Sequence, residues 1–308
     1  MSEKKPPLRS GHVSIVGRPN VGKSTLLNKI LNEKVAIVSP VPQTTRNPVR
    51  GIYTEERGQI IFIDTPGIHE EKDHLDRYMN RSSEGTMSGA DCIIHLVDVQ
   101  RRVGEEEKMV MDCLKDIKVP VILGLNKVDI KEKYMDQYLA LWQEARGETI
   151  HDTQHFVILP LSSKTGINVP KLIDLLFERL PEGPLLYPAD ILTDFPQKMA
   201  IADIIREKFF MVLRDELPHA VAVIVEQMVP RKNNVMYIGV QVLVERPSQK
   251  EIVIGQKGRV LKQVGSVART ELETLLEQKV FLDLYVKFRK DWRDNMEILK
   301  DMGMETAG

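Results

Sequence analysis

The first half of the chain alternates short apolar runs with segments whose apolar residues recur every three or four positions. The alternation of such runs with helical spacing indicates strands and amphipathic helices in turn. We predict strands at residues 12–16, 49–54, 59–64, 91–98, 120–125 and 155–159, and a short extended piece at 35–39. We predict helices at residues 25–32, 75–88, 105–118 and 168–180. This order predicts an α/β fold with a mostly parallel sheet covered by helices on both faces.

The pattern changes after a proline-punctuated stretch at residues 181–197. The second half predicts a smaller α+β unit in the order α-β-β-α-α-β. Its expected helices span residues 198–213 and 259–276, and its expected strands span residues 220–225, 236–244 and 280–289. An apolar strand at Ile252–Ile254 and a final helix at residues 291–304 complete the prediction. We therefore expect domains at residues 1–183 and 198–308, joined by a linker at 184–197.

A glycine-rich loop follows the first predicted strand. Residues Gly17–Thr25 have the form G-x-x-x-x-G-K-[ST] and precede a predicted helix. Strand, loop and helix N-terminus in that order form an anion site from backbone N–H groups and the helix dipole. Lys23 would reach the β- and γ-phosphates, and the Ser24 hydroxyl would bind Mg²⁺. We predict that this loop binds the phosphates through Gly17, Asn20, Val21, Gly22, Lys23, Ser24 and Thr25.

A second motif, Asp64–Gly67, stands where the apolar strand at 59–64 ends. A carboxylate at that position can hold Mg²⁺, so Asp64 is a candidate metal residue. The backbone N–H of Gly67 can bind a γ-phosphate and lose that contact after hydrolysis. The loop that follows Gly67 is therefore a candidate switch.

The motif Asn126–Asp129 follows the strand at 120–125 and predicts the base. The Asp129 carboxylate can accept hydrogen bonds from both N1–H and the N2 amino group of guanine, whereas adenine would leave it unpaired. Asn126 would brace this loop, and the stem of Lys127 would lie across the purine. The loop Ser162–Lys164, with Ser162, Ser163 and Lys164, would offer a backbone N–H to guanine O6.

The loop Gly255–Gly258 lies in the second predicted unit and has the form G-x-x-G. Such a loop clamps about four single-stranded nucleotides in KH domains. Residues 246–269 contain six lysines and arginines and one acidic residue, Glu251, which adds a basic stripe. We predict RNA contacts from Gly255, Gln256, Lys257, Gly258, Arg259 and Lys262.

Composition and charge limit the classes of ligand and location that the sequence favours. The net charge of −1 gives the whole molecule no electrostatic preference, so only local basic regions favour nucleic acid. Neither cysteine, Cys92 or Cys113, has a metal-like spacing, and we expect reduced thiols in a cytosolic protein. Residues 1–10 predict a polar, disordered arm without a targeting sequence, and no apolar run reaches membrane-spanning length. We interpret His95 as a packed core residue and Glu105–Glu107 as a solvated first helical turn.

The motifs in this order resemble the translation-factor-like GTPases, and the forms G-R-P-N-V-G-K-S-T and P-Q-T-T-R resemble the Era family. The segment Val253–Gly265 resembles the type II KH domain of that family. The resemblance implies that Thr45, with Thr44 as the alternative, completes the Mg²⁺ shell. Asn20 is similar to the asparagine associated with K⁺ in related GTPases, although it can equally be a loop-shaping residue.

By the same resemblance, the chain binds GTP and GDP and contacts single-stranded rRNA in the 3′ region of the small ribosomal subunit, whose assembly it assists. We expect a cytoplasmic monomer. The resemblance adds a peripheral contact with the inner face of the cell membrane, although no amphipathic anchor in the sequence requires it.

The predicted reaction is attack of water on the γ-phosphate, with Lys23, Thr45 and Gly67 as the catalytic candidates. Ras-type enzymes orient this water with a glutamine directly after D-x-x-G, and here that position is Ile68. No arginine finger is identifiable in the sequence. We therefore expect slow intrinsic hydrolysis that a partner accelerates.

Three alternatives compete with this interpretation. The second domain could bind protein or membrane instead of RNA. A TrmE-type tRNA-modifying GTPase would carry a C-terminal cysteine, and residues 302–308 contain none. An adenine-specific P-loop kinase is disfavoured by the motif Asn126–Asp129.

Overall fold

The computed structural model describes residues 6–131, 133–146 and 153–304. The chain divides into two compact units that interleave along the sequence. The first unit comprises Met1–Ala36, Thr45–Lys72 and Met79–Asp194, and the second comprises Ile37–Thr44, Asp73–Tyr78 and Phe195–Gly308. The domain limits expected from the sequence follow the chain without this interleaving, and they remain a prediction.

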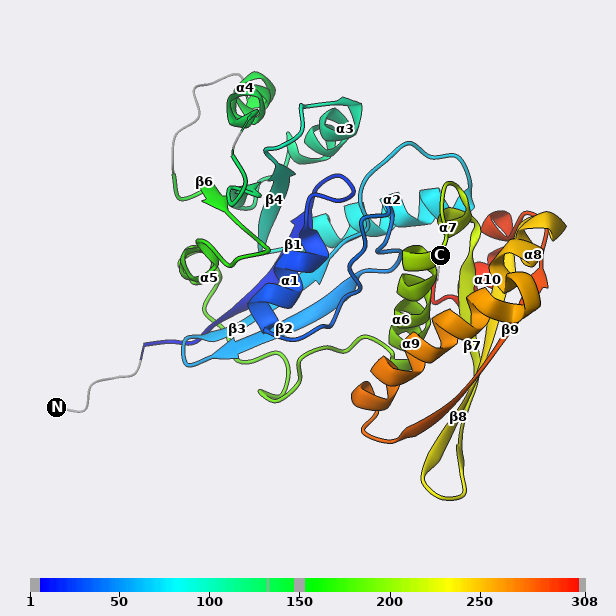
Figure 1. The fold of residues 1–308 in the computed structure, drawn as a ribbon. Helices are drawn as coiled ribbons and strands as arrows, with labels where there is room; N and C mark the ends of the chain where they lie inside the picture. Colours follow the sequence, from blue (N-terminus) through cyan, green and yellow to red (C-terminus); the bar gives the residue numbers. More distant parts are fainter. Residues whose placement is uncertain (1–5, 132, 147–152, 305–308) are drawn as a thin grey trace. The chain divides into compact units, whose positions relative to one another are not determined.

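A six-stranded sheet forms the centre of the first unit, with the strand order β2-β3-β1-β4-β5-β6 (Figure 1). All neighbouring strands are parallel except β2 and β3, which form an antiparallel hairpin. The strands are β1 (Arg9–Val16), β2 (Val49–Glu55), β3 (Gly58–Asp64), β4 (Cys92–Asp98), β5 (Val121–Asn126) and β6 (Phe156–Leu161). The predicted mostly parallel α/β fold is confirmed.

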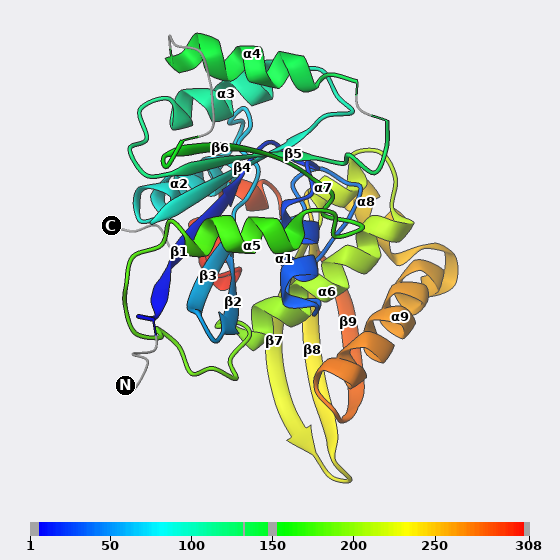
Figure 2. The same cartoon turned by 90° about the vertical axis from the view of Figure 1, so that its left-hand side faces the viewer.

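Helices cover both faces of this sheet (Figure 2). The helices are α1 (Lys23–Leu31), α2 (His74–Ser88), α3 (Glu105–Leu114), α4 (Met135–Arg146) and α5 (Val169–Phe177). Residues of α2, α3 and α4 share one apolar core with the sheet, which includes Met87, Val110 and Trp142. Helices α1 and α5 lie on the opposite face. Helix α4 has no counterpart among the predicted elements.

The strand register brings the predicted motifs to one edge of the sheet. Ile15 pairs with Asp64, so the end of β3 lies directly beside the start of the glycine-rich loop. Asp98 pairs with Asn126, and Asn126 pairs with Leu161. Because parallel strands end on the same side, residues far apart in sequence meet where ligands of such sheets bind.

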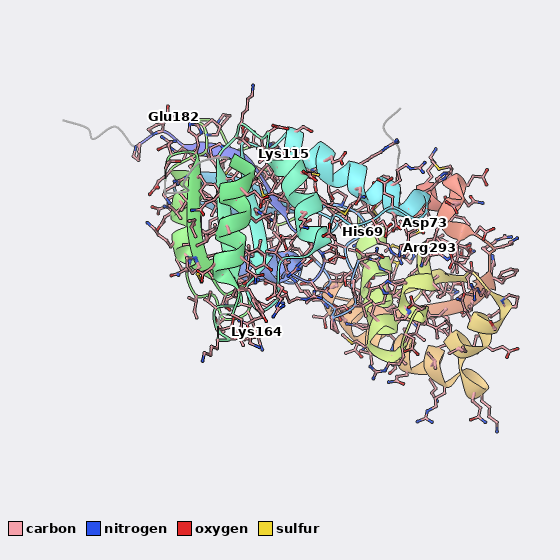
Figure 3. The ribbon with its side chains drawn as sticks, turned by 90° about the horizontal axis from the view of Figure 1, so that it is seen from above. His69, Asp73, Lys115, Lys164, Glu182 and Arg293 are labelled. Atoms are coloured by element: carbon pink, nitrogen blue, oxygen red, sulfur yellow. The ribbon has the colours of Figure 1, made fainter. Side chains whose placement is uncertain are left out.

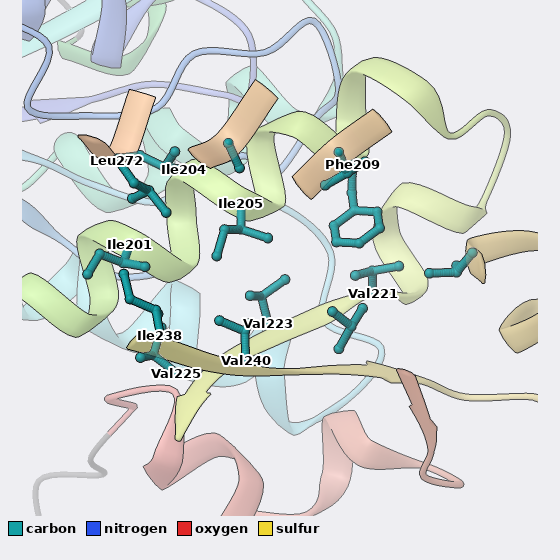
Figure 4. Packing of buried hydrophobic residues seen from close by; sticks show 14 of the residues in the cluster. Ile201, Ile204, Ile205, Phe209, Val221, Val223, Val225, Ile238, Val240 and Leu272 are labelled. Atoms are coloured by element: carbon teal, nitrogen blue, oxygen red, sulfur yellow. The ribbon is translucent and has the colours of Figure 1, made fainter. Parts of the chain in front are cut away.

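The second unit contains a three-stranded sheet in the order β7-β8-β9. Strands β7 (Ala222–Arg231) and β8 (Val235–Val244) are antiparallel, and β9 (Lys279–Phe288) runs parallel to β8. Helices α6 (Gln197–Val212) and α9 (Arg259–Leu275) pack their apolar residues onto one face (Figure 4). Phe209 and Leu272, both completely buried, meet the alternating valines of the strands there.

Short elements complete this unit. They are α7 (Leu217–Ala220), α8 (Pro247–Ile254), η1 (Gln256–Gly258), η2 (Trp292–Asp294) and α10 (Met296–Asp301). The completely buried Trp292 donates its indole N–H to the carbonyl of Ala220 at 3.0 Å, which fixes the C-terminal segment to the end of α7. The continuous helix predicted over residues 291–304 is therefore divided into η2 and α10.

The prediction of a strand at Ile252–Ile254 is wrong, because these residues end helix α8. Pro247 occupies the first turn of this helix, where its missing N–H costs nothing. The Gln249 side chain also accepts a hydrogen bond from the backbone N–H of Arg246 at 2.9 Å, which caps the helix start. These local signals outweigh the β-branched composition of the segment.

Two further expectations need correction. Strand β1 begins at Arg9, within the expected disordered arm, because Arg9 pairs with Gly58; residues 1–5 lie outside the described part. Residues 35–39 form no strand; instead Asn28 binds the backbone N–H groups of Val35 and Ala36. Among the described residues, no helix is long and apolar enough to cross a bilayer.

Candidate nucleotide and RNA sites

The glycine-rich loop between β1 and α1 has a backbone that side chains would obstruct. Gly17 and Gly22 have φ angles of 149° and 106°, and a Cβ at Gly22 would lie 2.6 Å from the amide nitrogen of Asn126. At Gly17 a Cβ would overlap the carbonyl oxygen of Leu96. Only glycine fits these positions, which leaves the N–H groups before α1 free to form an anion site.

Lys23 lies inside this loop. Its ammonium group donates hydrogen bonds to the carbonyls of Gly17 and Arg18, at 2.9 and 3.1 Å. Burial lowers the pKa of Lys23 to about 8, and the negative charges of Asp64 and Glu107 oppose this shift. The side chain is thus held within the loop and placed to bind phosphate oxygens.

Ser24, Thr45 and Asp64 converge. The Ser24 hydroxyl donates to Asp64 Oδ2 at 2.6 Å and lies 3.0 Å from the Thr45 hydroxyl. The other oxygen of Asp64, Oδ1, is buried without a hydrogen-bond partner. Burial raises the pKa of the Asp64 carboxyl to about 6, although Lys23 and the two hydroxyls counteract the effect. Two hydroxyls and one carboxylate oxygen left unpaired fit the oxygen ligands that Mg²⁺ prefers.

Thr44, the alternative to Thr45, has a different environment. Its hydroxyl donates to the carbonyl of Val41 at 2.6 Å, within the second unit. The geometry therefore favours Thr45 over Thr44 as the metal residue.

The segment after β3 closes over the glycine-rich loop. A Cβ at Gly67 would lie 2.7 Å from Cγ of Pro19, so this position needs glycine. Ile68 is buried in the apolar core and therefore cannot orient a water molecule at the phosphates. His69, labelled in Figure 3, lies with Nδ1 2.6 Å from the Gly67 carbonyl, a contact that the sequence motif did not indicate.

Asn126 and Lys127 connect the base-binding loops with the glycine-rich loop. Asn126 donates to the carbonyl of Val21 at 2.6 Å and accepts from the backbone N–H of Ser163 at 2.8 Å. The Lys127 ammonium group donates to the carbonyl of Asn20 at 3.0 Å and to Asp98 at 2.6 Å. Asn126 therefore braces the loops as expected from the sequence, although its role toward a base remains a prediction.

The remaining base-site candidates stand at the same edge of the sheet. Asp129 is exposed, as is Lys164 (Figure 3). Ser162 accepts from the backbone N–H of Thr165 at 3.1 Å, which shapes the loop after β6. The Ser163 hydroxyl is buried without a hydrogen-bond partner. Open carboxylate and amide positions beside a braced loop are suited to recognition of a purine edge.

Two residues of the glycine-rich loop have structural roles of their own. Asn20 adopts a left-handed conformation with φ 64°, so it shapes the loop whether or not it also binds K⁺. Val21 is completely buried. Thr25 belongs to the first turn of α1, where its N–H faces the anion site.

The loop between α8 and α9 carries the second site. Gly255, Lys257 and Gly258 all have positive φ angles, of 74°, 52° and 76°. Gln256, Arg259 and Lys262 are exposed beside them. Because α9 begins at Arg259, the helix N-terminus and basic side chains share one surface, which suits the backbone of a nucleic acid.

One interpretation of a charged run is wrong. Glu107 was expected in a solvated helical turn, but its side chain is completely buried and pairs with Arg18. Its two neighbours, Glu105 and Glu106, are exposed as predicted. His95 is buried in the core, as interpreted from the sequence.

Comparisons with known proteins agree with this geometry. Residues 12–127 match a family described as 50S ribosome-binding GTPase, and residues 216–293 match the KH domain. GTPase Era of Geobacter sp. strain M21 is 46% identical over 306 residues, which cover 99% of this chain and 100% of the relative. GTPase Era of Halothermothrix orenii is 44% identical over 296 residues, which cover 96% and 98%.

The chain belongs to the Era GTPase family. A crystal structure of Era in complex with MgGDPNP and nucleotides 1506–1542 of 16S ribosomal RNA matches this Era-family chain with a TM-score of 0.90 at 35% identity. It covers 97% of this chain and 100% of that one. A variant of Aquifex aeolicus Era bound to GDP and AlF4⁻ gives a TM-score of 0.88 at 36% identity and covers the same shares. The predicted family, the fold and the assignment as a GTPase are confirmed.

Proposed function

We propose that this Era-family GTPase is a switch that binds single-stranded rRNA from the 3′ region of the small ribosomal subunit and assists assembly of that subunit. The observation that carries the proposal is the presence, in one chain, of a braced phosphate loop and an exposed basic G-x-x-G loop. The matching Era structure with MgGDPNP and 16S rRNA supports the same pair of ligands.

Mg²⁺ would be held by Ser24, Thr45 and Asp64, where it would neutralise charge that develops on the phosphates. Lys23 would bind the β- and γ-phosphate oxygens from within the loop. The Gly67 N–H would bind the γ-phosphate. With Ile68 in the position of the usual glutamine, no side chain there orients the attacking water, and intrinsic hydrolysis is expected to be slow.

The second unit holds the chain segment that ends directly before Thr45. Ile37 belongs to the apolar core of that unit, and the backbone N–H of Val38 donates to Glu207 at 3.1 Å. Arg206 donates to the carbonyl of Thr44 at 2.6 Å. Movement of Thr45 toward a metal would therefore pull on a segment anchored to helix α6.

The segment after Gly67 is anchored in a similar way. Asp73 pairs with Arg293 at 3.2 Å, and the backbone N–H of His74 donates to Asp294 at 3.0 Å (Figure 3). All four residues belong to the second unit. Both switch candidates are thus continuous with the unit that carries the G-x-x-G loop, which supports nucleotide control of RNA binding.

The double variant Lys257→Glu and Arg259→Glu tests the RNA part of the proposal. It should lose binding to single-stranded RNA from the 3′ end of 16S rRNA while GTP binding stays at the parent level. Lys115→Glu, an exposed change directly after α3 in the first unit, is the matched control and should bind RNA like the parent. Unchanged RNA binding in the double variant would favour a protein or membrane partner for this unit.

The assembly role needs a cellular measurement. Replacing the parent gene with the double variant should reduce mature small subunits and leave precursors of their rRNA at the 3′ end. Normal subunit profiles despite lost RNA binding would contradict this role.

We also propose that the protein acts as a cytoplasmic monomer, with peripheral membrane contact as a further state. K⁺ binding at Asn20 is a separate proposal, tested by comparing GTP turnover in K⁺ and Na⁺ for the parent and for Asn20→Ala. Equal turnover of the parent in both salts would exclude it.

A further inference from the structure

A buried chain of polar side chains connects the phosphate loop with helices α3 and α4. Arg18 is the second residue of that loop, and its side chain runs into the protein interior instead of toward a nucleotide. Glu107 of α3, His95 of β4 and Trp142 of α4 follow in order, and all three are completely buried. None of the four was predicted from the sequence to bind the nucleotide.

The Arg18 guanidinium group has three partners. Nε forms an ion pair with Oε2 of Glu107 at 3.2 Å, although the two atoms lack hydrogen-bond geometry. One terminal nitrogen donates to the carbonyl of Arg102 at 3.1 Å, and the other donates to the hydroxyl of Tyr138 at 2.8 Å. Two hydrogen bonds and an ion pair from one planar group hold the Arg18 side chain in this orientation.

The available hydrogen-bond donors determine which group donates to which beyond Glu107. The indole N–H of Trp142 can only donate, so Nδ1 of His95 accepts from it at 3.0 Å. The ring proton of His95 is therefore on Nε2, which donates to Oε1 of Glu107 at 3.0 Å. Both oxygens of Glu107 thus face a positive or donor group.

The backbone carbonyl of Arg18 also helps to hold the side chain of Lys23. Lys23 donates to the carbonyl of Arg18 at 3.1 Å and to that of Gly17 at 2.9 Å. Burying an ion pair such as Arg18–Glu107 brings little net stability, because both charges lose their water. The pair is better explained by what it fixes, namely the backbone of a loop that glycines at positions 17 and 22 would otherwise leave flexible.

We propose that Arg18 and Glu107 are positioning residues of the GTP site: the relay Arg18–Glu107–His95–Trp142 fixes the phosphate-loop backbone and, through the Arg18 carbonyl, the Lys23 ammonium group. The inference rests on the proposed GTP binding. It adds an explanation of what fixes the backbone of the phosphate loop, and it assigns a role to helices α3 and α4.

The variant Glu107→Gln tests this assignment. The amide keeps the size of the side chain and removes the charge that faces Arg18. We expect Mg²⁺-dependent GTP binding, measured by calorimetry and corrected for the folded fraction, to weaken by roughly tenfold to a hundredfold, as when supporting residues behind a metal site are lost. Leu114→Ala, in the same helix and core, is the control; it should lose stability and keep the GTP affinity of the parent.

A double variant separates positioning from stability. Arg18→Met with Glu107→Leu replaces the ion pair with apolar side chains and should be more stable than Arg18→Met alone, which leaves the buried Glu107 charge unpaired. GTP affinity should remain reduced, because nothing then fixes the loop. Full recovery of both properties, or parent affinity in Glu107→Gln, would overturn the proposal. Failure of the parent itself to bind GTP would instead overturn the proposed function.

A spectroscopic measurement gives an independent readout. The sequence has two tryptophans, so Trp292→Phe leaves Trp142 as the emitter. Addition of GDPNP and Mg²⁺ should shift Trp142 emission in this background, and the shift should disappear when Glu107→Gln is added. An equal shift in both proteins, or none in either, would contradict the relay.

Discussion

The two glycine-rich loops of this protein are built from the same parts and differ in their surroundings. Each precedes a helix N-terminus, and each needs positive φ angles. In the phosphate loop, Lys23 is buried and its partners are fixed carbonyls. In the G-x-x-G loop, Lys257 is exposed and a Cβ at Gly258 would meet nothing within 4 Å.

A similar backbone arrangement therefore suits two kinds of ligand. A braced loop holds one triphosphate in one geometry, and the energetic cost of arranging it is met on folding. An exposed basic loop can follow a flexible single strand of nucleic acid, so its affinity depends on charge and exposure.

Asp129→Ala should abolish the preference for guanine. The remaining site offers no carboxylate to N1–H and N2, so the preference for GTP over ATP should fall by roughly 10⁴-fold. Competition between the two nucleotides measures this directly, and RNA binding of the nucleotide-free protein should not change. Retained discrimination would show that another group reads the base.

Equivalent glycine substitutions should have unequal effects in the two loops. Gly22→Ala forces a Cβ to within 2.6 Å of Asn126, so GTP binding should be lost together with several kcal/mol, on the order of 3, of folding stability. Gly258→Ala meets open space and carries only the left-handed strain of about 1 kcal/mol. Thermal unfolding of both variants checks this; similar losses would mean that the loops are equally constrained.

RNA and GTP binding should depend differently on salt. If Lys257, Arg259 and Lys262 each neutralise one phosphate, removing any one of them should reduce the slope of log affinity against log salt by about 0.7. The slope for GTP should not respond to these variants. Titrations between low and moderate salt test the point, and an unchanged RNA slope in all three would place the RNA elsewhere.

The smallest predicted effect is a pH dependence of the metal- and nucleotide-free protein. The pKa of Asp64 in the folded state, about 6, lies above the ordinary value of 3.8 because of burial. The folded state therefore binds this proton more tightly than the unfolded chain, and the resulting stability is lost as pH rises through about 6.

Between pH 5 and pH 7.5, the parent should lose about 1 kcal/mol of unfolding free energy relative to Asp64→Asn. Urea unfolding in the presence of a chelator measures the difference. Parallel pH profiles for the two proteins would contradict the assigned burial effect.

The sequence predicted that the nucleotide motifs meet at one edge of the sheet, because they are local motifs at strand ends. Parallel strands necessarily bring Ser24, Asp64 and Asn126 to one edge, so adjacency followed from the fold class. The G-x-x-G loop was identified from its sequence form, even though Ile252–Ile254 before it were assigned to a strand. The β-branched residues of that segment suggested a strand. The helix-start residues Pro247 and Gln249 stabilise a helix instead.

The buried polar contacts around the phosphate loop could not be predicted in this way. Glu107 stands in an acidic run, and only its distant partner Arg18 distinguishes it from Glu105 and Glu106. Helix α4 supplies Tyr138 and Trp142. Its apolar residues have helical spacing, but no helix was predicted there from the sequence. Buried polar contacts across 90 residues leave no local sequence pattern.

We propose that the nucleotide bound in the phosphate loop controls RNA binding by the G-x-x-G loop. This coupling can be measured as the affinity of the full chain for single-stranded RNA from the 3′ end of 16S rRNA, with GDPNP and Mg²⁺ and again with GDP. RNA binding should be tighter with GDPNP by roughly 5- to 150-fold, the usual range of coupling between sites. Equal affinities in the two nucleotide states would contradict it.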